Sequence, residues 1–150
     1  VANDGFAESN MAFDLFSKIR EMFEGDTAVR MVAEDPALSA EILLLFRMVL
    51  ADGAVEKAEL DTLKRICSEA FGINEESFGD VVSYLQQYGY ETNTSQALST
   101  FRGYPLERRI QLARHLAEIA KADSTLNQQE VRLLARTLEV LHLDPQDIRS

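Results

Sequence analysis

The sequence predicts an all-α protein, a compact bundle of about seven to nine helices built on two similar helix–turn–helix hairpins. Three observations predict this fold. Leu, Ala, Glu, Arg and Gln, which all favour helices, dominate the composition, and three Pro and seven Gly leave few breaks. Apolar residues recur at helical spacing along most of the chain. Finally, one acidic turn motif between two such segments occurs twice.

The chain is expected to begin with an N-terminal helical extension, residues 1–35. Over residues 6–23, apolar residues that include Phe13, Phe16 and Phe23 recur at helical spacing and form one face of an amphipathic helix. Its polar face holds more acidic than basic residues, whereas anionic lipid favours a basic face. We therefore expect this helix to dock either on its own domain or, in a homodimer, on a second copy. A short helix over residues 27–33 follows.

The next two helices have clear start and stop signals. Asp35 and Pro36 are typical of an N-cap and a first helical position. The helix that they begin is apolar over most of its circumference, which predicts a central position. The following helix runs from about residue 56 to residue 71, and Gly72 is a typical residue to end it.

The remaining chain predicts four more helices and a terminal turn, with no linker between them. The helices are expected at residues 74–89, 92–101, 105–122 and, after a second acidic turn, 127–141. Asp144 and Pro145 then begin the last turn. Residues 1–150 are therefore expected to form a single domain.

The acidic turn motif organises this arrangement. Residues 51–59 read Ala-Asp-Gly-Ala-Val-Glu-Lys-Ala-Glu, and residues 122–130 repeat the pattern 71 positions later. In both copies Asp follows Ala, an aliphatic residue comes three positions after the Asp, and a Glu comes seven after it. Two hairpins of this kind can pack about a pseudo-two-fold axis and bury the faces that neither buries alone. Residues 74–105 would cover one side.

The spacing Asp-Gly-x-Val-x-x-x-Glu matches the second half of an EF-hand calcium loop. The ligand positions of the first half fall on Met48 and Leu50, which cannot bind calcium, so an ordinary EF-hand is excluded. If both turns lie together, however, their four carboxylates would form one shared site for a divalent cation, Ca²⁺ or Mg²⁺. These candidate metal ligands are Asp52, Glu59, Asp123 and Glu130.

Helix capping offers a second interpretation of the same residues. Asn127 and Glu130 have the spacing of a capping box, and Glu59 occupies the same position in its helix as Glu130. Capping therefore accounts for both glutamates without a metal, and it is the stronger interpretation for them. Asp52 and Asp123 precede the cap by four residues, and for them both interpretations stay open.

Over about residues 36–145 the duplicated motif resembles the tellurite-resistance TerB-like family, which includes the N-terminal domain of a membrane-anchored DnaJ-type co-chaperone. The second copy departs from the family pattern because Ser124 replaces Gly. The resemblance implies a compact helical domain with an acidic cluster suspected of binding metal. It also links the chain to stress resistance and membrane-associated complexes rather than to a defined reaction. By position, Glu56 becomes a weaker fifth candidate ligand.

No residue pattern indicates an enzyme. The chain has no Gly-rich phosphate loop, no nucleophile elbow and no His pair at zinc spacing. His115 is expected on the solvated side of its helix, and Cys67 shares an apolar stripe and is expected in the core. We therefore expect a protein without catalytic residues.

Charge and composition limit the classes of partner that are expected. The formal net charge is −10, and residues 1–75 carry 15 Asp and Glu against 7 Lys and Arg, which disfavours nucleic acid. No apolar run approaches the roughly 20 residues of a membrane span, and no secretion signal opens the chain, so a cytoplasmic protein is expected. The expected function is a cation-responsive helical domain in stress response. The alternative is a metal-free interaction or scaffold module for an unidentified protein partner.

Overall fold

The computed structural model describes residues 27–149, with residues 52 and 124 excepted. Helices, and no strand, form the secondary structure of this described part, which confirms the all-α prediction. Residues 27–33 are helical, as expected. The helices that follow are α2 (Pro36–Val49), α3 (Lys57–Phe71), α4 (Glu75–Glu91), α5 (Thr94–Ser99), α6 (Leu106–Ala122), α7 (Gln128–Val140) and the 3₁₀ turn η1 (Pro145–Ile148). The predicted helix over residues 6–23 lies outside the described residues.

Helix α2 is the centre of the bundle, as its apolar sequence predicts. It contacts α3, α4, α5 and α6, and most of its side chains are buried. It begins as expected, with the Asp35 carboxylate accepting hydrogen bonds from the amides of Ala37 and Leu38, both at 3.1 Å. Because neighbouring helices cover α2 on most of its circumference, its apolar residues leave water almost completely, which favours folding.

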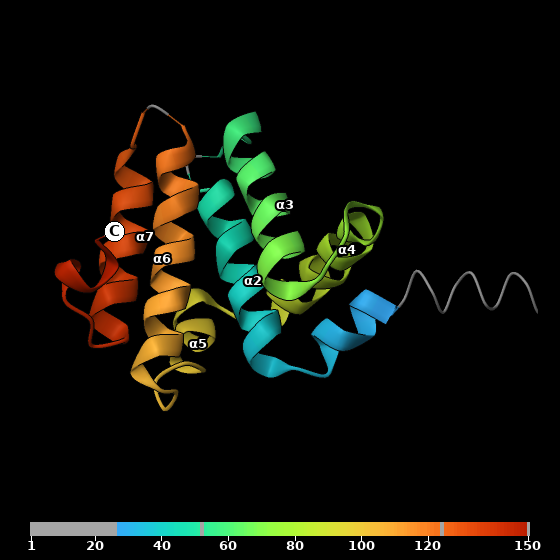
Figure 1. Ribbon diagram of the computed structural model, residues 1–150, viewed down its shortest axis with the longest axis horizontal. Helices are drawn as coiled ribbons and strands as arrows, with labels where there is room; N and C mark the ends of the chain where they lie inside the picture. The colour runs from blue at the N-terminus through green and yellow to red at the C-terminus, as the bar shows by residue number, and fades with distance from the viewer. Residues whose placement is uncertain (1–26, 52, 124, 150) are drawn as a thin grey trace, which may run out of the picture.

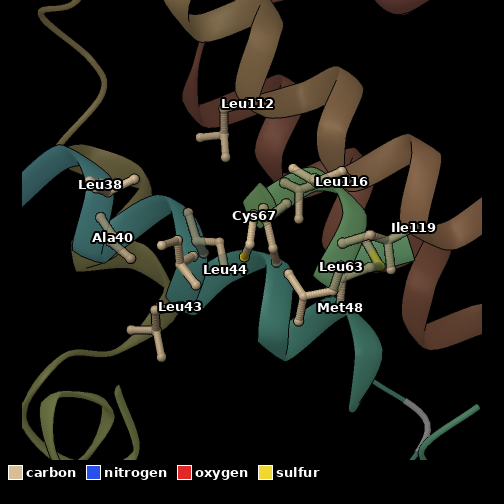
Figure 2. Close-up of a cluster of buried hydrophobic side chains, with 14 of the residues drawn as sticks. Leu38, Ala40, Leu43, Leu44, Met48, Leu63, Cys67, Leu112, Leu116 and Ile119 are labelled. Carbon is tan, nitrogen blue, oxygen red and sulfur yellow. The ribbon is translucent and has the colours of Figure 1, made fainter. Parts of the chain in front are cut away.

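The two hairpins, α2–α3 and α6–α7, lie side by side with α2 and α6 next to each other (Figure 1). Helix α3 also packs on α6. Figure 2 shows the result: Met48 from α2, Leu63 and Cys67 from α3, and Leu116 and Ile119 from α6 meet in one cluster. All five side chains are fully buried. The core is therefore made mainly between the hairpins.

The ends of α3 and α7 repeat each other. Gly72 and His142 follow these helices, and both have left-handed backbone, with φ of 70° and 56°. The next residues, Ile73 and Leu143, are both buried, and their amides bond back to carbonyls of the preceding helix. The duplication thus extends to the way each hairpin ends.

Element boundaries differ modestly from the expectations. Helix α4 continues two residues beyond Gly89, and α5 is confined to six residues, with Asn93 as its cap. Two apolar residues within the predicted helices are exposed, Leu106 and Val131. Both stand in the first turns of their helices.

Candidate functional site

The two acidic turns lie at the same end of the molecule. One connects α2 to α3 and the other connects α6 to α7, and Figure 1 shows both connections at the top of the bundle. Ala51 from the first connection and Gln129 from the start of α7 line a common pocket. The neighbourhoods of the two turns therefore adjoin, as a shared site would require.

The second turn is a capped helix start. The Asn127 side chain accepts a hydrogen bond from the Glu130 amide at 2.8 Å, and Glu130 Oε1 accepts one from the Asn127 amide at 3.0 Å. This reciprocal pair confirms the predicted capping box. Just before it, Asp123 Oδ1 accepts a hydrogen bond from the Thr125 amide at 3.1 Å. Asp123 and Glu130 thus each direct one oxygen to the backbone of their own turn.

The first turn also leads into a helix with a buried Glu at its third position, but the start of that helix is capped differently. Gly53 has φ of 85°, and its amide donates to the Leu50 carbonyl at 2.9 Å. Glu56 takes the N-cap position of α3 in extended conformation, but its side chain makes no capping hydrogen bond. Glu59 stands at the third helical position, the place that Glu130 takes in α7. The two glutamates are 2% and 1% exposed, so both copies bury a carboxylate at this point.

The described carboxylates do not form a metal centre by themselves. Among the residues that the structure describes, no group of three or more His, Cys, Asp or Glu side chains is arranged to hold a metal ion. Glu59, Asp123 and Glu130 are therefore not gathered into one such group, and Asp52 lies outside the described residues. Calcium takes six to eight oxygen ligands, so water would have to supply much of the coordination shell here.

A buried charge cluster, which the sequence analysis missed, lies between α2 and α6. Glu41 is completely buried, and its Oε2 lies 2.7 Å from Nδ1 of His115, whose side chain is only 14% exposed. The expectation that His115 is a solvated surface residue is therefore wrong. Its ring also lies at right angles to the ring of Phe71, with 5.8 Å between the ring centroids. The signal in the sequence was Glu41 itself, a carboxylate among the apolar residues of α2.

Arg108 supplies the positive charge to this cluster. Its Nη2 lies 2.6 Å from Glu41 Oε1, and its guanidinium carbon lies 5.2 Å from the centroid of the Phe101 ring. The contact is an ion pair without hydrogen-bond geometry, since Glu41 Oε1 receives no hydrogen bond from the described residues. The attraction between the two charges persists without this geometry, because a charge attraction at this distance depends little on angle. The negative charge of Glu41 is thus balanced by the neighbouring Arg108.

Cys67 lies in the core, as predicted. Burial, with a further contribution from the charge of Glu41, raises the pKa of the Cys67 thiol to about 12. Because the thiolate is the reactive form of cysteine, a thiol with this pKa is a poor nucleophile at neutral pH. Cys67 therefore contributes packing rather than nucleophilic chemistry.

Comparison with known proteins identifies the family. The family model described as tellurite resistance protein TerB matches residues 38–150, well over half of the chain. No curated protein and no solved structure matches the chain significantly. Over the described part of the chain, none of the helices combines the length and the apolar character needed to cross a membrane. The match covers both hairpins and both acidic turns, and the chain therefore belongs to the TerB family.

Proposed function

We propose that this TerB domain is a non-enzymatic helical module of stress response, and that its paired acidic turns bind a divalent cation. Tellurite resistance, which the family description names, is the stress that we would test first. The observation that supports cation binding best is the pair Glu59 and Glu130. These equivalent carboxylates are both nearly completely buried, at the end of the bundle where the two turns adjoin.

Glu59 and Glu130 support cation binding because their carboxylates are buried. A carboxylate that leaves water loses solvation energy, so it needs hydrogen bonds or a nearby cation to compensate. A hydrogen bond to Glu130 Oε1 supplies part of this compensation in the second turn. A cation shared with Asp52 and Asp123 would supply more. Because few protein oxygens are available, the affinity should be weak, and a hard cation that keeps several waters, Mg²⁺ or Ca²⁺, fits best.

Calorimetric titration of the full chain with Ca²⁺, Mg²⁺, Mn²⁺ and Zn²⁺ tests the proposal. The variant with Asp52→Asn and Glu59→Gln should lose binding, because it removes two candidate ligands at almost constant volume. The variant with Glu76→Gln and Asp80→Asn is the matched control: it removes the same charge from α4, and Glu76 and Asp80 are exposed. No heat with any cation at millimolar concentration, or equal weakening in both variants, would refute a site at the turns.

A metal-free interaction module is the second candidate function, and the capping box at the second turn favours it. Glu130 Oε1 is already engaged by the Asn127 amide, so this carboxylate has a structural role without a metal. In this case the domain acts through a protein partner in the cytoplasm, including a complex held at a membrane by that partner, or through a second copy of itself.

The amphipathic pattern of residues 6–23 supports self-association. Light scattering should then show a dimer for the full chain and a monomer after deletion of residues 1–24. An unchanged mass and an unchanged melting temperature after the deletion would argue against a role for this segment. Together with an absence of cation binding, a dimer would select the interaction module over the cation-binding domain.

A further inference from the structure

A pocket of about 340 Å³ opens beside the acidic turns, yet the charged residues that line it are all basic. Three arginines line it, Arg47 near the end of α2 and Arg132 and Arg136 on α7. Thr94 at the start of α5, Gln129 and Leu133 complete most of the remaining wall. The volume falls in the range that is typical of small-molecule sites.

The positive charge of this pocket is not balanced by its own wall. None of the residues that line it is acidic, although the whole chain has a net charge of −10. A second pocket, about 470 Å³ between α3, α6 and η1, is different. It also holds basic side chains, but it contains Glu118, which pairs with Arg65. Three cations without an acidic partner in the wall attract an anion.

The three arginines differ in how firmly they are held. Arg47 is anchored, because its guanidinium donates to the carbonyls of Thr92 and Gly89 at 2.6 and 3.2 Å and to the Thr94 hydroxyl at 3.1 Å. Arg136 donates one hydrogen bond to the hydroxyl of Ser95. Arg132 is exposed, and no ion pair joins it to any side chain that the structure describes.

We propose that this pocket binds a phosphate group, either as inorganic phosphate or as part of a small phosphate ester. Guanidinium groups bind phosphate through pairs of parallel N–H···O bonds, and several of them can share one dianion. Arg132 and Arg136 have N–H donors left for such bonds, and Arg47 adds a fixed positive charge to the wall. Leu133 and Ala51 give the wall an apolar part, which suits the organic portion of an ester.

Amide chemical shifts of the ¹⁵N-labelled full chain, titrated with inorganic phosphate and with glycerol 3-phosphate, would test this site. EDTA in the buffer keeps the result independent of cation binding at the acidic turns. The test variant carries Arg132→Gln and Arg136→Gln, two exposed positions whose replacement should leave the fold intact. The matched control carries Arg114→Gln and Arg149→Gln, also exposed, which removes the same charge elsewhere.

The site predicts shift changes that saturate and are centred on residues 47–51, 94–95 and 129–136. The test variant should bind at least tenfold more weakly, and the control should bind like the wild type. Similar affinity for both ligands would identify the phosphate group as the whole ligand, and tighter binding of the ester would show that the apolar wall contributes. The proposal is overturned by no shift up to roughly 10 mM of either ligand, or by equal weakening in both variants.

Discussion

Glu41 and His115 join the two hairpins through the centre of the bundle, with 2.7 Å between Glu41 Oε2 and His115 Nδ1. Glu41 belongs to α2 and His115 to α6, so this contact ties together the first helices of the two copies. A buried charge can be satisfied in few arrangements, whereas apolar side chains tolerate many. The pair therefore favours one register of α2 against α6.

Replacement of Arg108 by Met should destabilise the fold by about 2 kcal/mol. The completely buried Glu41 would lose the cation that lies 2.6 Å from its Oε1 and keep only His115. The loss should stay below that of a fully buried ion pair, because the Arg108 side chain is 26% exposed. Urea denaturation followed by circular dichroism measures the change. Arg102→Met, at an exposed position before α6, should stay within about 0.5 kcal/mol of the wild type. Equal effects of the two replacements would show that the ion pair contributes nothing.

Alkaline pH should weaken the fold through Cys67. Its pKa is about 12 in the folded protein and close to 9.0 without burial, so above pH 9 the unfolded chain loses this proton first. The contribution of the protonated thiol to the free energy of unfolding is fully present below pH 9. It is lost as pH rises toward 12, at up to about 1.4 kcal/mol per pH unit. Urea denaturation between pH 7 and pH 11 measures it.

Cys67→Ala is the control, because this variant lacks the thiol. The replacement leaves a small cavity in the core and should lower stability at pH 7. The difference from the wild type should then shrink as pH rises above 9, since only the wild type carries the thiol penalty. Two stability curves that stay parallel up to pH 11 would contradict the role of Cys67.

Local signals predicted the elements of this fold, but not the contacts between them. Each capping motif lies within one helix end, so the sequence contains all of its residues. The examples are Asp35 with Pro36, Gly72, and Asn127 with Glu130. His115 was misplaced because its helix neighbours are polar, while the partner that buries it, Glu41, is 74 positions away. Likewise, the spacing of the acidic turns could not predict that Glu59 and Glu130 are both buried. Burial depends on the packing of other helices.

Replacement of Glu56 by Asn should stabilise the protein by about 0.5–1 kcal/mol. Glu56 takes the N-cap position of α3 in the extended conformation of a cap, but its side chain makes no capping hydrogen bond. Asn at this position would reproduce the arrangement that Asn127 has in α7. Asn127→Ala should have the opposite effect, a loss of about 1 kcal/mol, because the Glu130 amide loses its acceptor. Thermal unfolding measures both, and a Glu56→Asn variant that melts below the wild type would contradict the prediction.

Replacement of His142 by Gly should raise the free energy of unfolding by about 0.5–1 kcal/mol. His142 has φ of 56°, in the left-handed region, where a Cβ atom is strained and Gly is not. The equivalent position after α3 already holds Gly, Gly72, with φ of 70°. Gly72→Ala should therefore cost about 1 kcal/mol, although its added Cβ would meet no atom within 4 Å.

His142→Ala controls for the lost imidazole and should not stabilise, because Ala keeps the Cβ atom. Urea denaturation of the three variants measures these differences. If Ala and Gly at position 142 gave the same gain, the imidazole rather than the backbone would be the source of strain.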